Sequence, residues 1–397
     1  MEKKEEFIRV GTTLYKIVNQ PRLDGGYVKK RIAWNTETLR QDYGKDYMAS
    51  VPKYDGFCTV PDHVDYKPVI GKFLNLYEPI SHAPEQGDFP CIRSLVEHIF
   101  GKQYELGMDY LQLLYLYPIQ KLPILLLVSE ERNTGKSTFL NFLKALFQNN
   151  VTFNTNEDFR SQFNSDRAGK LLIVVDEVLL SRREDSERLK NLSTTLSYKV
   201  EAKGKDRDEI AFFAKFVLCS NNEYLPVIID AGETRYWVRK IDRLQSDDTC
   251  FLQKLKAEIP AFLYHLQHRQ LSTEKESRMW FAPPLLHTEA LQKIIRSNRN
   301  RLEIEMCELI LDIMTSTGID IFSFCCNDIL TLLANTYVKA EKHQVRKVLQ
   351  ECWKLTPAHN TLTYTTYQVD YNRECRYSPL RRTGRFYTVT RAFLEAL

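Results

Sequence analysis

The chain has 397 residues, which is enough for two or three domains, each with its own hydrophobic core. Hydrophobic residues make up 43% of the chain and charged residues 27%, proportions that are ordinary for a soluble globular protein and exclude disorder on a large scale. The formal net charge of +4 is too small to indicate a nucleic-acid partner, so local clusters of charge have to support that inference.

Cysteine usage and hydrophobicity predict the compartment. The nine cysteines contain no Cys-x-x-Cys pair, which favours reduced thiols inside a cell. Residues 1–6 are mostly charged, unlike the apolar stretch of a signal peptide. The longest apolar run, residues 122–128, contains Pro123 and is too short to cross a bilayer. We therefore expect a cytoplasmic protein with no membrane partner.

Residues 1–90 are expected to form a small β-rich accessory domain followed by an irregular linker. Residues 7–10 and 13–18 are rich in β-branched and aromatic side chains, and Asp24-Gly25-Gly26 predicts a turn between strands. Recurring prolines up to Pro90 argue against long helices. The linker is expected over residues 78–90.

From residue 91 apolar strands alternate with helices. Two amphipathic helices come first, because apolar side chains recur at helical spacing between residues 95 and 116. The elements that follow are, in order, a strand at 124–128, a helix at 136–147, a strand at 170–175, a helix at 184–196 and a strand at 214–220. Nearly continuous Leu, Ile and Val in such strands predicts a parallel sheet covered on both faces, which is the α/β class.

The last third of the chain predicts a separate DNA-binding domain. One amphipathic helix is expected at 250–270, and Ala282-Pro283-Pro284 indicates a boundary after it. The expected elements beyond the boundary are helices around 301–314, 327–335 and 342–353, then β-rich stretches at 362–371 and 385–390. Three helices followed by a two-stranded wing is the order of a winged-helix domain. The expected domains are therefore 1–90, 91–280 and 281–397.

A P-loop candidate lies between the first core strand and its helix. The motif is Thr134-Gly135-Lys136-Ser137-Thr138, and the expected phosphate-binding residues are Arg132, Asn133, Thr134, Gly135, Lys136, Ser137 and Thr138. Backbone N–H groups at the start of a helix bind phosphate, Lys136 is expected to reach the β- and γ-phosphates, and Ser137 to ligate Mg²⁺. The full motif has glycine at position 130, where this chain has Glu130.

A second apolar strand ends in two carboxylates, Asp176 and Glu177, as a Walker B strand does. Asp176 is expected to hold Mg²⁺, and Glu177 to act as general base for the attacking water. The third strand ends at Ser220 and is followed by an asparagine pair. Asn221 is the first candidate to orient water near the γ-phosphate and Asn222 the second; alternatively the pair only forms a turn. Arg235, or else Arg239, is the candidate arginine finger.

Five motifs in this order resemble those of superfamily 3 helicases: Thr134-Gly135-Lys136-Ser137-Thr138, Val175-Asp176-Glu177, Lys203-Gly204-Lys205-Asp206, Ser220-Asn221-Asn222 and Thr234-Arg235-Tyr236. The likeness is closest to the helicase part of phage and mobile-element primase-helicases, including the poxvirus type, and spans residues 91–245. It implies an AAA-like core, a hexameric ring with ATP between subunits, and translocation along single-stranded DNA. It also implies that Arg235 acts on the nucleotide of a neighbouring subunit.

The resemblance also assigns DNA contacts. Residues 200–207 are similar to the hairpin that lines the central channel in the family, where Lys203 and Lys205 would grip DNA phosphates; without the family this is a solvated charged loop. In the tail, basic and aromatic residues alternate, and Arg381 and Arg382 are the candidates there, although arginines at a subunit interface would look the same. No primase carboxylate set matches in the first domain, where Asp62, His63 and Asp65 only weakly indicate a metal site.

The expected function is therefore that of an ATP- and Mg²⁺-dependent DNA helicase in phage or mobile-element replication. Its expected partners are single-stranded and replication-fork DNA, further copies of the chain in a hexamer, and a separate primase or other replication proteins. One alternative is a P-loop ATPase that remodels or loads replication proteins without unwinding. Another is an ATP-binding initiator or switch, against which Glu177 argues because a water-activating carboxylate implies hydrolysis.

Overall fold

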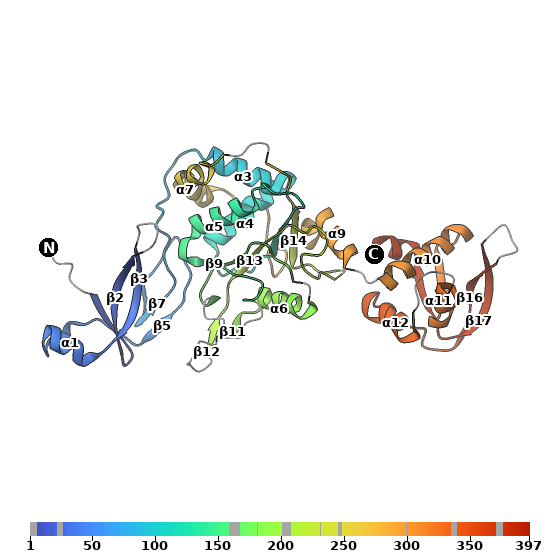
Figure 1. Cartoon of the computed structure of the whole chain (residues 1–397), viewed down its shortest axis with the longest axis horizontal. Coiled ribbons are helices and arrows are strands. Elements are labelled where there is room, and N and C mark those ends of the chain that lie inside the picture. The colour runs from blue at the N-terminus through green and yellow to red at the C-terminus, as the bar shows by residue number, and fades with distance from the viewer. Residues whose placement is uncertain are drawn as a thin grey trace. The chain divides into compact units, whose positions relative to one another are not determined.

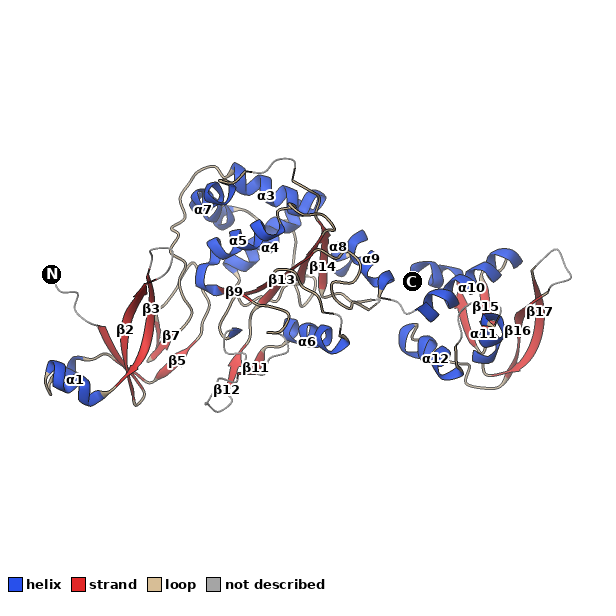
Figure 2. Ribbon diagram, viewed as in Figure 1, coloured by secondary structure: helices blue, strands red, loops and turns tan. Residues whose placement is uncertain are grey.

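The computed structural model describes residues 6–21, 27–158, 167–180, 182–200, 208–230, 232–244, 248–298, 301–334, 340–370 and 376–397. The chain folds as two units, drawn in Figure 1 and coloured by secondary structure in Figure 2. Unit 1 comprises Met1–Pro226 and Thr234–Ala290, and unit 2 comprises Val227–Glu233 and Leu291–Leu397. None of the described helices is both long enough and apolar enough to cross a membrane.

Unit 1 begins with two small sheets. Strands β1 (Glu6–Val10), β2 (Thr13–Pro21), β3 (Tyr27–Trp34) and β4 (Lys53–Tyr54) form one sheet, and β5 (Gly56–Cys58), β6 (Val69–Ile70) and β7 (Phe73–Asn75) form the other. The helices α1 (Thr36–Tyr43) and α2 (Tyr47–Ser50) lie between β3 and β4. Phe7, Leu14, Leu39 and Val51 form a small core here. The strands expected at 7–10 and 13–18 are confirmed, whereas the expected turn at 24–26 lies outside the described residues.

The main sheet of unit 1 is parallel, as the sequence predicts. Its strands are β8 (Ile124–Val128), β9 (Val151–Phe153), β10 (Leu172–Val175), β13 (Lys215–Ser220) and β14 (Tyr236–Lys240), arranged in the order β14-β8-β13-β10-β9. Every residue of β8, β10 and β13 is buried, which explains their continuous apolar sequence. β13, the third of the expected core strands along the chain, lies between β8, which precedes the P-loop, and β10, which is followed by Asp176. The sequence analysis did not predict β9 or β14.

Four helices pack together against this sheet. They are α3 (Pro90–Phe100), α4 (Tyr104–Leu116), α5 (Lys136–Phe147) and α7 (Phe251–His268), and Figure 1 shows them grouped together, with α6 (Arg183–Thr194) apart from them. Between α6 and β13 an antiparallel hairpin is formed by β11 (Ser197–Val200) and β12 (Asp208–Ala211). Its tip, with Lys203 and Lys205, lies outside the described residues. A short helix, α8 (Pro283–Leu286), follows near the end of unit 1.

Unit 2 combines helices with two pairs of strands. Its elements are α9 (Glu289–Ser297), α10 (Arg301–Thr317), β15 (Ile321–Phe324), α11 (Cys326–Leu333), α12 (Lys342–Lys347) with a π-helical continuation (Val348–Cys352), β16 (Leu362–Val369), β17 (Tyr377–Gly384), β18 (Tyr387–Thr390) and α13 (Arg391–Ala396). The three expected helices and the first β-rich stretch are confirmed. The expected pairing of 362–371 with 385–390 is wrong, because β16 pairs with β17 and β18 pairs with β15. Alternate side chains of β18, Tyr387 and Val389, are buried in the core of unit 2, which also contains Phe322 and Phe324.

The motif Asp62, His63 and Asp65 forms a turn and a packing contact. The Asp62 carboxylate accepts hydrogen bonds from the backbone N–H groups of Val64 at 2.9 Å and Asp65 at 2.8 Å. The His63 ring lies among Tyr77, Tyr115 of α4 and Phe147 of α5, and a 3.0 Å hydrogen bond joins its Nε2 to the Tyr77 hydroxyl. Within the described residues no cluster of three or more His, Cys, Asp or Glu side chains is arranged to hold a metal ion.

We expect the partly buried His63 to make unit 1 sensitive to acid. Burial lowers the pKa of His63 from 6.5 to about 4, against the opposing effect of Asp62 and with a smaller contribution from Lys215. The unfolded chain then binds the proton more readily than the folded chain. This contribution to stability is therefore complete above pH 6.5 and disappears as pH falls towards 4. The full loss is about 3 kcal/mol.

The measurement is the urea midpoint of unit 1 unfolding at a series of pH values through this range, in the full chain. His63→Gln removes the titrating group and should flatten the dependence on pH, whereas His268→Gln, at an exposed position at the end of α7, should leave it unchanged. An identical slope in the wild type and in His63→Gln would contradict the assignment.

Candidate nucleotide-binding site

The carboxyl ends of β8, β10 and β13 meet around one pocket of about 300 Å³. Its lining residues are Arg132, Asn133, Thr134, Gly135, Lys136, Ser137, Thr138, Asp176, Glu177 and Asn221. These are all the residues predicted for the nucleotide, the metal ion and water activation, apart from the arginine finger. The structure thus brings together side chains that lie almost ninety residues apart in the sequence.

The P-loop turns through left-handed backbone before α5 begins. Gly135 has φ +81° and Asn133 has φ +57°. Glycine takes this conformation without strain, and asparagine is one of the few other residues that tolerate it. A hydrogen bond of 3.0 Å between His98 Nε2 of α3 and the Thr134 carbonyl oxygen holds the loop from outside. This contact of His98 was not predicted from the sequence.

Lys136 is a buried cation that lies beside neutral oxygens. Its Nζ donates to Thr134 Oγ1 at 3.0 Å and to Ser129 Oγ. Burial lowers the pKa of Lys136, while the charges of Asp176, Glu223 and Glu177 oppose this shift. Among the described residues no carboxylate forms an ion pair with Lys136. A buried charge without a paired opposite charge is unfavourable, and a phosphate group would supply the missing anion.

Ser137 and Asp176 provide oxygen atoms suited to Mg²⁺. The Ser137 hydroxyl donates to Asp176 Oδ2 at 2.7 Å, so α5 and the end of β10 are in direct contact. Mg²⁺ prefers such oxygen ligands and takes its remaining ligands from phosphates and water. The two residues therefore fit a metal ion that arrives with a nucleotide.

Glu177 follows β10 in a strained conformation. Its φ of +61° is unusual for a residue with a side chain, and strain of this kind occurs at functional sites. Asn156 holds the segment on both sides, because its Nδ2 donates to the Glu177 carbonyl oxygen at 3.1 Å and its Oδ1 accepts from Leu179 N at 3.0 Å. Val178 N donates to the Cys219 carbonyl oxygen at 2.6 Å. Neither contact of Asn156 was predicted from the sequence.

The two asparagines after β13 have different surroundings. Asn222 Oδ1 accepts hydrogen bonds of 2.9 Å from the backbone N–H groups of both Tyr224 and Leu225, so Asn222 forms the turn. Asn221 is exposed and lines the pocket. Asn221 is therefore the member of the pair placed to meet a bound nucleotide.

Glu130, which replaces the expected glycine, does not enter the pocket. Its backbone is not left-handed, and its side chain is exposed. Its N–H donates to Glu223 Oε1 at 3.2 Å, and Lys240 Nζ lies 3.3 Å from the same oxygen. Glu223 is only 2% exposed, so this carboxylate ties the start of the P-loop to the segment after β13 and to the end of β14. The position consequently accepts a side chain.

The two candidate finger arginines have different environments. Arg235 directly precedes β14, and its carbonyl oxygen accepts from Ile124 N at 2.8 Å at the start of β8. Because β14 and β8 are parallel, Arg235 lies at the end of the sheet away from the pocket in its own chain. Arg239 donates to the Phe100 carbonyl oxygen at 2.7 Å and to Gln103 Oε1 at 2.9 Å, so it caps α3. The finger role of Arg235 stays a prediction that requires a neighbouring copy.

The predicted DNA contacts in the tail are only partly available. Arg382 Nη1 lies 3.1 Å from Asp328 Oδ1, and the Asp328 side chain is 1% exposed. This ion pair accounts for the position of Arg382 without nucleic acid. Arg381 is exposed. DNA binding by either residue stays a prediction.

Three comparisons place the chain among known proteins. A model for a family of unknown function, DUF5906, matches residues 127–239. No curated protein sequence matches the chain. The apo structure of the NrS-1 C-terminal region (305–718) matches with a TM-score of 0.65 and 16% identity, over 96% of this chain and 95% of that one. A second form of that region matches with a TM-score of 0.59 and 17% identity, over 89% and 85% of the two chains.

This chain shares the fold of the NrS-1 C-terminal region. The match covers nearly the whole length of both chains, so it includes both units of this chain. A JCV helicase structure also matches, over 58% of this chain and 65% of that one, but its TM-score of 0.33 and 12% identity are too low to support an argument.

Proposed function

We propose that the chain is an ATP-dependent DNA helicase of the superfamily 3 type, with an AAA-like core that assembles as a hexameric ring. One observation supports this most strongly: Lys136, Ser137, Asp176, Glu177 and Asn221 converge on a single pocket at the carboxyl ends of a parallel sheet. The order of the family motifs, which include the hairpin and Arg235, supports the assembly of this ATPase as a ring and its action on DNA. Phage or mobile-element replication, with a separate primase, is the role that the resemblance favours.

The proposed reaction is hydrolysis of the γ-phosphate by water. The N–H groups of the P-loop and Lys136 bind the phosphates, and Asn221 orients the water. Glu177 accepts a proton as the water oxygen bonds to phosphorus, and the bond to the ADP oxygen breaks to release ADP and phosphate. Ser137 and Asp176 would hold Mg²⁺, which neutralises phosphate charge when bound. Arg235 of a neighbouring subunit would stabilise the charge that develops.

We further propose that unit 2 is a winged-helix domain that contacts DNA. Its three helices α10, α11 and α12 precede the β16–β17 hairpin, which is the winged-helix order. A hollow of about 410 Å³ in this unit is lined by Lys342, Arg346 and Arg385, and none of the described residues that line it is acidic. These cations fit DNA phosphates better than the paired Arg382 does.

The test is ATP hydrolysis with and without single-stranded DNA. We expect oligo-dT to stimulate hydrolysis several-fold, because a translocating ring couples its nucleotide cycle to DNA. Lys136→Ala should abolish hydrolysis, whereas Lys102→Ala, which removes an exposed lysine, should not change it. A strand-displacement assay then reports unwinding. Hydrolysis that does not respond to DNA would favour a protein remodeller or loader instead.

A further inference from the structure

A second groove lies at the end of the main sheet that is away from the nucleotide pocket. It has a volume of about 580 Å³ and is formed by residues 116–121, which lead into β8, together with Lys275, Arg278 and Trp280 from the segment after α7. Lys215, the first residue of β13, donates from its Nζ to the Pro118 carbonyl oxygen and so fixes this end of the sheet. None of the proposed steps of ATP hydrolysis uses this groove.

The groove presents aromatic and apolar side chains to solvent. The rings of Tyr117 and Trp280 stack with centroids 6.4 Å apart and planes 20° apart. Tyr117 is 52% exposed, and Ile119 and Leu196 in the same groove are 63% and 76% exposed. Large apolar side chains that gather in one exposed hollow indicate a binding surface.

Cations border the aromatic pair. Lys275 and Arg278 are both exposed, and neither forms an ion pair with any residue in the described part of the chain. Lys121, which is buried, also lines the groove, and Asp62 supplies the one carboxylate among the described lining residues. Glu274 and Glu276 lie on the same segment but not among the lining residues. The charge next to the rings is therefore predominantly positive.

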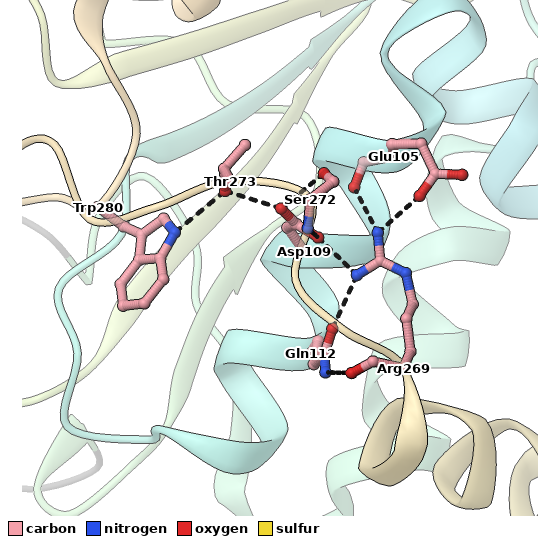
Figure 3. Close-up of polar contacts among 7 residues, drawn as sticks. All are labelled: Glu105, Asp109, Gln112, Arg269, Ser272, Thr273 and Trp280. Carbon is pink, nitrogen blue, oxygen red and sulfur yellow. Dashed lines mark hydrogen bonds and ion pairs between the residues drawn. The ribbon is translucent and has the colours of Figure 1, made fainter.

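A buried hydrogen-bond network fixes the aromatic wall in advance. Asp109 of α4 is 0% exposed and accepts from Ser272 Oγ at 2.8 Å, from Thr273 Oγ1 at 2.7 Å and from Arg269. Trp280 Nε1 donates to Thr273 Oγ1 at 3.1 Å, and Figure 3 shows the line of contacts from Asp109 through Thr273 to the indole. A ligand that stacks on Trp280 meets a surface that is already ordered, which favours affinity.

The groove adjoins the base of the β11–β12 hairpin. Leu196 directly precedes β11, and its carbonyl oxygen accepts from Phe212 N at 2.8 Å just after β12. Lys121 Nζ donates to the Phe212 carbonyl oxygen at 2.7 Å and lies 5.0 Å from the centroid of the Phe212 ring. The groove therefore lies beside the base of the hairpin that the resemblance assigns to DNA contact.

We propose that this groove binds single-stranded nucleic acid, with bases stacked on Tyr117 and Trp280 and phosphates on Lys275 and Arg278. Exposed aromatic faces beside unpaired cations are the usual surface for single strands, because every base can stack and every phosphate is negative. A purely apolar peptide would leave the two cations unused. This inference rests on the proposed function in one respect, the choice of DNA as the nucleic acid.

The test measures binding of fluorescent oligo-dT to the full chain by anisotropy at several salt concentrations. Lys275→Ala with Arg278→Ala should weaken binding about tenfold and reduce the magnitude of the slope of log affinity against log salt by about 1.4, because each phosphate contact on a single strand contributes about 0.7. The matched control, Lys102→Ala with Lys256→Ala, removes two exposed lysines elsewhere in unit 1 and should change affinity less than twofold. Tyr117→Ala should weaken binding about tenfold with an unchanged salt slope, because stacking releases no counterions.

Equal affinity of the groove variant and the control variant would overturn the proposal while leaving the helicase function intact. A groove variant that keeps its affinity for oligo-dT but changes its particle mass would also overturn it, since the groove would then hold a second copy of the chain. Failure of the wild type to bind oligo-dT would overturn both the groove and the DNA helicase.

Discussion

Glu177→Gln should lower the rate constant of ATP hydrolysis by at least about 100-fold while ATP affinity stays within about twofold. A general base contributes roughly 10²- to 10⁴-fold, and glutamine keeps the size of the side chain but cannot accept the proton. The contacts of Asn156 with the backbone around residue 177 do not involve the carboxylate, so the strained turn should persist. Single-turnover hydrolysis and binding of a fluorescent ATP analogue measure the two quantities separately.

Glu130→Gln is the matched control. The same chemical change is then made at an exposed carboxylate that neighbours the P-loop but does not line the pocket, so hydrolysis should be unaffected. Full hydrolysis by Glu177→Gln would contradict the role of this residue and would require another group to activate water.

The Glu177→Gln variant also tests whether Arg235 acts on the nucleotide of a neighbouring copy. Because Arg235 lies at the end of the sheet away from the pocket of its own chain, the proposed finger role requires a nucleotide bound by another copy. Subunits with Arg235→Ala retain Glu177, and subunits with Glu177→Gln retain Arg235. Mixing the two inactive variants should restore part of the activity at the shared sites that are complete. No recovery would indicate that Arg235 is structural.

The part of the site that the sequence predicted is built from local patterns. A continuous apolar strand followed by Gly135-Lys136-Ser137, and another followed by Asp176-Glu177, are each readable without knowledge of the fold. Parallel strands end at the same side of a sheet, so these tips were expected to meet, and the position of β13 between β8 and β10 confirms the arrangement. The sequence analysis ranked Asn221 before Asn222, and the coordinates agree with this order, because Asn222 Oδ1 forms the turn while Asn221 lines the pocket.

The features that the sequence did not predict depend on distant partners. β14 contains Arg239 and Lys240, and it is a strand because β8 supplies its hydrogen bonds. β17 contains Pro379 and Gly384, which disfavour a strand assignment, yet it pairs along its whole length with β16. Glu223 looks like a surface residue beside a turn, and only the fold brings it to Glu130 N and Lys240. Such contacts have no local signature.

Asp109→Ala should destabilise unit 1 by about 3 to 5 kcal/mol, the largest effect on stability that we expect from a single change. The substitution leaves Arg269 in a largely buried position, with 10% of its side chain exposed, without its buried carboxylate partner. It also removes the acceptor of the Ser272 and Thr273 hydroxyl groups, as Figure 3 shows. Urea unfolding monitored by tryptophan fluorescence measures the loss.

Glu105→Ala is the matched control, because it removes an exposed partner of Arg269 instead of the buried one. Glu105 pairs with Arg269 at 2.6 Å, but 64% of its side chain is exposed. An exposed ion pair contributes less than about 1 kcal/mol, so this variant should remain nearly as stable as the wild type. Thr273 accepts a hydrogen bond from Trp280, so loss of Asp109 should also disturb the aromatic wall of the groove. Without urea, where the variant protein is still folded, Asp109→Ala should therefore weaken oligo-dT binding. Glu105→Ala should not. Equal losses of stability in both variants would mean that the charge of Arg269, rather than the buried acceptor, orders the segment after α7.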